Sequence, residues 1–180
     1  MLKIALKEAE RLRAFISGKF PTLATYKDAV QKELDSKGYL TSLFGRRRRK
    51  PISFSEMLNY VQQSSASDIT VCAMIYLTRK YRLACMIHDD LSFFIPDNKD
   101  TEPSLAKIAE AMICIPWVYV CDSEKNKKYI PLSVDCSVGE RWGAQNKLFT
   151  LDALDFGYKT EDVCIDRGLE IIEELKSYGW

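Results

Sequence analysis

Three consecutive polar residues, His88-Asp89-Asp90, separate two short hydrophobic segments, Tyr81 to Ile87 and Leu91 to Ile95. Two adjacent carboxylates buried without partners would repel each other and lose their hydration. A tight turn between two strands avoids both costs, because it presents the carboxylates to water or to a cation. Such oxygen ligands suit a hard divalent ion such as Mg²⁺, which keeps coordination positions for water and phosphate. The segment therefore predicts a β-hairpin with a metal-binding tip, and an ordinary acidic turn is the alternative.

A run of five cations, Arg46-Arg47-Arg48-Arg49-Lys50, is the second feature with a chemical consequence. Guanidinium groups bind phosphate oxygens through paired hydrogen bonds, so the arginines predict contacts with a nucleic-acid backbone. A solvated basic loop is the alternative. The net charge is only +1 and the segment after Thr150 is rich in acids, so local basic density would have to attract phosphate.

The cysteines and the single histidine do not indicate a zinc site. The six cysteines occur singly in apolar or strand-like segments, without a C-x-x-C pair, which is typical of buried reduced thiols. No apolar run approaches the length of a membrane span, and the start of the chain lacks a hydrophobic signal segment. We therefore expect a soluble cytoplasmic protein without a membrane partner, whose 180 residues, 47% hydrophobic, can form a core.

The elements around these residues follow from the periodicity of the apolar positions. Strict alternation from Ile130 to Val138 predicts a strand with one buried face, and Trp117 to Cys121 is a candidate partner strand. The last predicted helix packs through Ile165, Leu169 and Ile172. Helical spacing predicts helices over about 4–18, from Pro21 to Gly38, and over about 54–79, 103–114 and 160–177. The expected fold class is α+β, with helices packed on a small antiparallel sheet.

Four segments in order resemble motifs of the family A (Pol I-like) DNA polymerases, over about residues 4–145. The hairpin segment Met86–Leu91 (MIHDDL) resembles motif C of that family. The resemblance implies a partial polymerase palm: 1–50 a helical fingers-to-palm segment, 51–149 a palm segment with the motif C hairpin, and 150–180 a C-terminal helical extension. The other three segments are FPTL at Phe20–Leu23 with GYLTSLFGRRR at Gly38–Arg48, NYVQQSSASDI at Asn59–Ile69, and PLSVD at Pro131–Asp135 with VGERW at Val138–Trp142.

The resemblance implies a role for each matched residue. Asp89 is expected to ligate the two catalytic Mg²⁺ ions of a two-metal mechanism, with Asp90 beside the metals and His88 near the primer terminus. Asp90 stands where the family usually has glutamate. Asn59 and Gln63 are expected to contact the minor groove of primer–template DNA, where every base pair offers acceptors to an amide donor. The matched arginines, Arg46, Arg47 and Arg48, would bind the DNA backbone, and deoxynucleoside triphosphates would be the second substrate.

Several family elements have no counterpart in these 180 residues. Motif A with the other metal-binding aspartate, the nucleotide-gripping fingers helix and the thumb are missing, so we expect the isolated chain to be inactive. The segment between Arg48 and Asn59 is shorter than usual, and Ser55 stands where an arginine is often found. Residues 117–129 resemble an insertion, and the tail after about residue 150, without a recognised counterpart, is a candidate docking element for another polypeptide.

Three hypotheses explain why the chain resembles some polymerase motifs but has no counterpart of others. The favoured one is a split polymerase, possible in a phage-type system, in which a second polypeptide supplies motif A, the nucleotide-gripping helix and the thumb. The second is a non-catalytic nucleic-acid-binding or regulatory remnant, and the third is a gene fragment without an independent role. A T-odd phage-like RNA polymerase is a poorer match, since the GRRR and QSSASD segments fit the DNA enzymes better.

Overall fold

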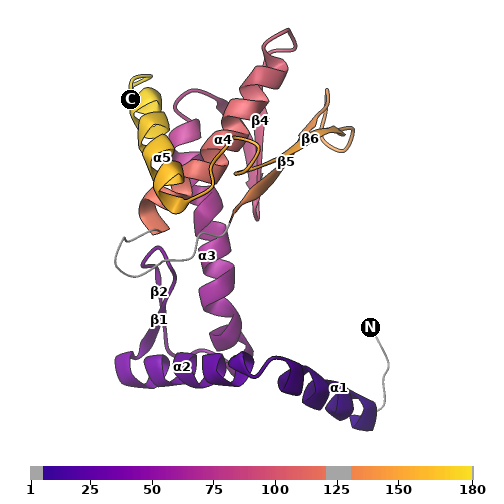
Figure 1. The fold of residues 1–180 in the computed structure, drawn as a ribbon, viewed down its shortest axis with the longest axis vertical. Helices are drawn as coiled ribbons and strands as arrows, with labels where there is room; N and C mark the ends of the chain where they lie inside the picture. Colours follow the sequence, from indigo (N-terminus) through magenta and orange to yellow (C-terminus); the bar gives the residue numbers. More distant parts are fainter. Residues whose placement is uncertain (1–5, 121–130, 180) are drawn as a thin grey trace. The chain divides into compact units, whose positions relative to one another are not determined.

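The computed structural model describes residues 6–120 and 131–179, which form helices and antiparallel hairpins (Figure 1). The α+β class is confirmed, but the described strands form three separate two-stranded sheets instead of one small sheet. The elements are α1 (Leu6–Lys19), α2 (Thr22–Lys37), β1 (Tyr39–Thr41), β2 (Arg47–Arg49), α3 (Phe54–Leu77), β3 (Arg82–Ile87), β4 (Asp90–Phe94), α4 (Thr101–Val120), β5 (Ser133–Val138), β6 (Asn146–Asp152) and α5 (Glu161–Lys176).

The chain divides into two compact units, Met1–Ser64 and Ser65–Trp180, with the boundary inside α3. The first unit has a small core in which Val30 and Leu34 of α2 pack with Leu40 of β1 and Met57 of α3. Gly38 ends α2 as expected: its φ of 75° is left-handed, and its N–H donates to the Leu34 carbonyl.

Helix α1 forms where its apolar periodicity predicted a helix, but it contributes nothing to this core. No residue of α1 is buried against the described part of the chain, and Leu12, Phe15 and Ile16 are each about half exposed or more. Periodicity therefore predicted the conformation of the segment correctly without identifying a surface that covers its apolar face.

Helix α4 is the central helix of the second unit. Its residues from Ile108 to Trp117 are mostly buried, including Ile113, Cys114 and Ile115. Among the described residues α4 alone has the length and apolar composition of a membrane-spanning helix, whereas no such span was expected from the apolar runs of the sequence. Burial in the core accounts for that composition, since a core helix surrounded by other elements is apolar on several faces.

The expected partner strand at Trp117 to Cys121 is wrong. Trp117–Val120 form the last turn of α4, while Cys121 lies outside the described residues. A short continuous apolar run fits a buried helix and a buried strand equally well, so periodicity could not separate them. The partner of β5 is instead β6, with Val134 opposite Leu151.

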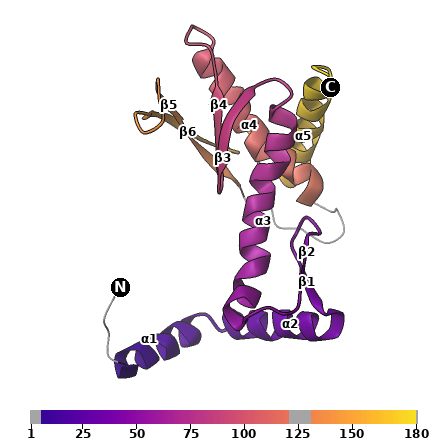
Figure 2. The same ribbon diagram turned by 180° about the vertical axis from the view of Figure 1, so that it is seen from behind.

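The C-terminal residues complete the core of the second unit. Helix α5 lies against α4 in both ribbon views (Figures 1 and 2) and buries Cys164, Gly168, Ile171, Ile172 and Leu175. Leu169, predicted to pack, is 47% exposed instead. The two helices approach so closely at Gly168 that a Cβ there would lie 2.6 Å from the Cys114 carbonyl oxygen.

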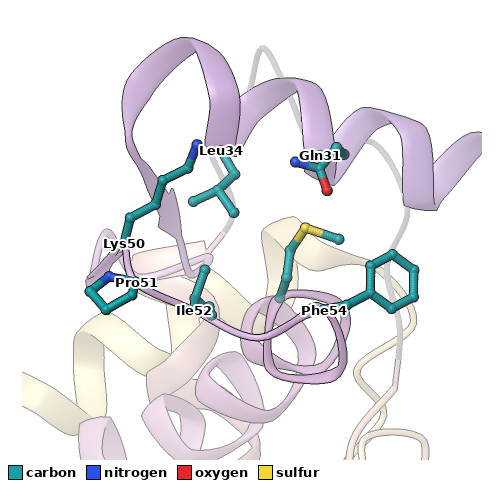
Figure 3. Close-up of a pocket in the computed structure, with 7 residues that line it drawn as sticks. Gln31, Leu34, Lys50, Pro51, Ile52 and Phe54 are labelled. Carbon is teal, nitrogen blue, oxygen red and sulfur yellow. The ribbon is translucent and has the colours of Figure 1, made fainter.

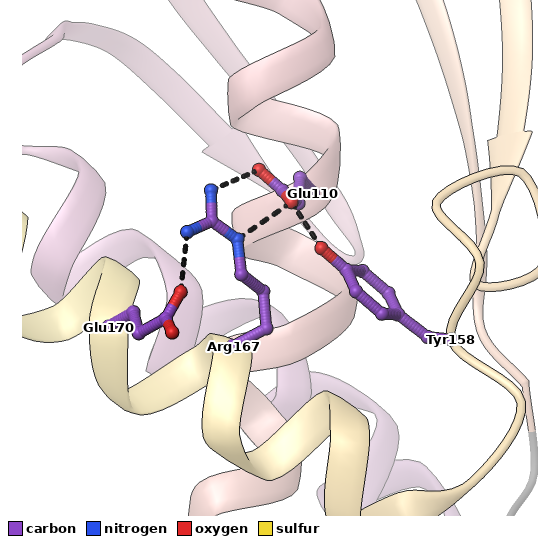
Figure 4. A network of polar contacts seen from close by, with 4 residues as sticks. All are labelled: Glu110, Tyr158, Arg167 and Glu170. Atoms are coloured by element: carbon purple, nitrogen blue, oxygen red, sulfur yellow. Dashed lines mark hydrogen bonds and ion pairs between the residues drawn. The ribbon is translucent and has the colours of Figure 1, made fainter.

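An ion-pair network fixes the register of α5 on α4 (Figure 4). Arg167 donates to both carboxylate oxygens of Glu110, at 2.9 and 3.1 Å, and its third nitrogen donates to Glu170 at 2.9 Å. The Tyr158 hydroxyl donates to the same Glu110 carboxylate. Burial acts to raise the pKa of Glu110, but the hydrogen bonds from Arg167 and Tyr158 outweigh it and leave that pKa below its ordinary value.

Candidate metal and nucleic-acid interface

The predicted hairpin around His88 and Asp89 is confirmed. Strands β3 and β4 pair down to Ile87 opposite Asp90, which leaves His88 and Asp89 as a two-residue turn. His88 has a φ of 56°, in the left-handed region that two-residue hairpin turns require. Glycine or asparagine adopts this conformation more readily than histidine, so the backbone at His88 is locally strained.

The hairpin is anchored at its base and exposed at its tip. Phe93 packs edge-on against Tyr81, with ring centroids 6.1 Å apart, and both side chains contact the core of the second unit. His88, Asp89 and Asp90 are all exposed. Because Ile87 and Asp90 are directly opposite in the register, their side chains share one face of the hairpin.

The tip offers hard oxygen donors but only part of a metal site. Asp89 and Asp90 present carboxylates to solvent, which fits the ligand chemistry of Mg²⁺. Within the described ranges, no group of three or more histidine, cysteine, aspartate or glutamate side chains is arranged to hold a metal ion. A complete site therefore needs at least one further donor besides these two carboxylates.

Asn59 and Gln63 lie on one exposed face of α3. They are one helical turn apart, and Gln62 and Ala66 continue the same exposed stripe. The opposite side of this turn faces the core of the first unit through buried Met57. The structure thus brings the two amides together in a row that a groove of nucleic acid can reach, and their contacts with DNA stay a prediction.

Most of the arginine run forms a strand and not a basic loop: Arg47–Arg49 are β2, and Arg46 directly precedes it. Strand β2 pairs with β1, placing Arg48 opposite Leu40 and Arg47 opposite Thr41. The Arg46 guanidinium donates to the Ser64 carbonyl at 3.0 Å, and the Tyr60 hydroxyl donates to the Arg46 carbonyl at 2.9 Å. Arg46 therefore ties the turn of this hairpin to α3.

A cavity of about 550 Å³ lies under α2 in the first unit (Figure 3). The Lys50 ammonium at its rim is paired with the Asp35 carboxylate at 2.8 Å. The walls are mainly apolar, so the cavity offers no arrangement of groups for catalysis. Its lining residues are Gln31, Leu34, Lys50, Pro51, Ile52, Phe54 and Met57.

This chain is similar in sequence to bacterial DNA polymerases. The model of DNA polymerase family A matches residues 1–144. DNA polymerase I of Geobacillus stearothermophilus is 30% identical over 159 residues, covering 78% of this chain and 17% of that enzyme. DNA polymerase I of Treponema pallidum is 28% identical, covering 79% of this chain and 15% of that enzyme. The thermostable DNA polymerase I of Thermus filiformis is 27% identical, covering 78% of this chain and 18% of that enzyme.

The chain thus spans less than a fifth of the length of these relatives. No solved structure matches it significantly. The family match ends before β6 and α5, so both elements lie beyond the matched residues, although α5 contributes buried side chains to the core of the second unit.

Proposed function

This chain belongs to DNA polymerase family A, and from that premise we propose that it contributes the motif C hairpin and part of the DNA-binding surface to template-directed DNA synthesis. The observation that carries the proposal is Asp89, exposed at a two-residue turn inside the matched region. Residues 51–149 would act as the palm segment, 1–50 as the fingers-to-palm segment and 150–180 as an extension.

Asp89 would supply one of the carboxylates that hold the two Mg²⁺ ions, with Asp90 beside it and His88 toward the primer end. When bound, the ions stabilise charge on the reacting phosphate oxygens. The strained turn serves this role by holding the Asp89 carboxylate beyond the last paired residues, where a substrate can reach it. Asn59 and Gln63 would donate to acceptors in the minor groove of the primer–template duplex.

The remaining catalytic parts would come from elsewhere. Motif A, the nucleotide-gripping helix and the thumb would be supplied by a second polypeptide or by a longer form of this one. Without motif A and the nucleotide-gripping helix, the 180 residues alone would not extend a primer. The complete enzyme would use deoxynucleoside triphosphates and act on DNA in the cytoplasm.

The test is reconstitution of primer extension with a polypeptide that carries the missing family elements, added separately and as a fusion. Extension should require both the partner segment and Mg²⁺, and Asp89→Asn should reduce it by about a hundredfold to a thousandfold, the scale of losing a catalytic charge-stabilising group. Asp97→Asn is the matched control, since Asp97 is another exposed acid just beyond β4. Equal extension by the Asp89 and Asp97 variants would refute the role of Asp89.

A non-catalytic nucleic-acid-binding protein is the second candidate. It is favoured by the contrast between the partial set of metal donors at the hairpin tip and the exposed arginines of β2 and amides of α3. In that case Asp89→Asn would leave duplex binding and any cellular function intact, and reconstitution would give no extension.

A further inference from the structure

The four consecutive arginines do not have one role, because the strand separates them. Successive side chains in a strand point to opposite faces, so Arg47 and Arg49 share one face and Arg48 the other. Arg48 lies opposite Leu40, which is completely buried, so it is on the inner face of the hairpin. Arg49 and Arg47 lie opposite Tyr39 and Thr41, on the outer face.

The inner and turn arginines are already engaged within the protein. The Arg48 guanidinium is 3.6 Å from the Glu56 carboxylate at the start of α3. The Arg46 guanidinium donates to the Ser64 carbonyl. A phosphate at either group would compete with a contact between the hairpin and α3.

The outer arginines, Arg47 and Arg49, are exposed, and Arg47 is held by an aromatic ring. The Arg47 guanidinium carbon lies over the Tyr39 ring, 4.7 Å from its centroid, and this cation–π contact restricts the side chain. Arg49 is exposed two residues along the same face, about 7 Å away at the rise of a strand. Neither forms an ion pair with any residue in the described part of the chain.

The surrounding charges favour an anion at this face. The sequence contains no acid between Asp35 and Glu56, and both of these acids are engaged, by Lys50 at 2.8 Å and by Arg48. The outer face therefore carries two guanidinium charges without an acidic neighbour along the hairpin. Paired guanidinium donors at this spacing fit phosphates of a nucleic-acid backbone.

We propose that Arg47 and Arg49 bind backbone phosphates of the primer–template duplex, while Arg46 and Arg48 hold the hairpin in place. This inference rests on the proposed function for the identity of the ligand. It adds Arg49, which lies outside the matched GRRR motif, and it removes Arg46 and Arg48 from the phosphate-binding set.

The experiment measures binding of the full 180-residue chain to a fluorescein-labelled primer–template duplex by anisotropy, across a series of NaCl concentrations. Arg47→Gln and Arg49→Gln should each reduce the slope of log affinity against log salt by about 0.9, the value for one phosphate contact. Arg48→Gln and Lys37→Gln should change that slope by less than half as much. Lys37 is a surface cation of α2 paired with Glu33, so its loss cannot disturb the strand.

Circular dichroism checks that each variant is folded, and the Lys37 control stands even where Arg48→Gln unfolds the hairpin. The inference is overturned if Arg49→Gln behaves like Lys37→Gln, or if the wild-type chain shows no salt-dependent binding. The same variants in reconstituted primer extension separate the two proposals. Extension that needs Asp89 but not Arg47 or Arg49 removes this inference and leaves the proposed function standing.

Discussion

Replacing Gly168 with alanine tests whether the C-terminal helix is packed against α4 as the structure shows. A Cβ at this position would lie 2.6 Å from the Cys114 carbonyl oxygen and 2.7 Å from a methyl carbon of Val118. Both distances are below any normal contact, and the carbonyl belongs to a buried helix that cannot rotate aside. Helix α5 would have to move away from α4.

Two opposing effects set the size of the change. Alanine favours a helix over glycine by about 1 kcal/mol, whereas overpacking a close contact costs about 1–3 kcal/mol. Displacing α5 would also strain the adjacent pair between Arg167 and Glu110, so the upper part of that range applies. We expect a net loss of about 1–2 kcal/mol, which lowers the melting temperature by about 2–8 °C for a chain of this size.

The assay is thermal unfolding followed by far-ultraviolet circular dichroism, with Gly18→Ala as the control. Gly18 is also in a helix, α1, but a Cβ there meets nothing within 4 Å, so only the helix propensity acts. That variant should melt at or above the wild-type temperature. A Gly168→Ala protein that melts as high as the Gly18→Ala protein would refute the close approach of α4 and α5.

Substitutions at two further positions, Glu110 and His88, probe the network on α4 and the hairpin tip. Because the folded pKa of Glu110 lies below its ordinary 4.5, its stabilising effect is complete above that pH and is lost as the pH falls through the folded pKa. Glu110→Gln should therefore cost about 1–3 kcal/mol in urea unfolding at pH 7 and less at pH 3; an equal cost at both pH values would contradict the ion pair. At His88, where φ is 56°, valine should be about 1–2 kcal/mol less stable than glycine in the same assay. Equal stability of the two His88 variants would mean that the turn is not left-handed.

Local chemistry predicted the hairpin around His88 and Asp89 correctly, and the metal-binding role of its tip stays a prediction. Two hydrophobic segments around three polar residues specify a hairpin with few alternatives, and Gly38 specifies the end of α2 by its backbone freedom. These features depend on residues close together in the chain, so their consequences follow without knowledge of the rest of the fold.

The separate roles of the four arginines needed more than local chemistry, although a signal for them is present in the sequence. A β-strand assignment for residues 47–49 separates Arg48 from Arg47 and Arg49 by alternation alone. Residue type does not suggest that assignment, because arginine has no preference for strands. Pairing with β1, whose Leu40 is buried against α2 and α3, is what makes the run a strand.

The sequence by itself determined the family, the α+β class and the acidic hairpin, since each follows from short patterns of residue type and spacing. Tertiary structure alone decided that Trp117–Val120 continue a core helix, that β6 pairs with β5 and that α5 closes on α4 at Gly168. The reason is physical: an apolar segment specifies that it must be covered, whereas the identity of the covering surface depends on contacts between residues far apart in the chain.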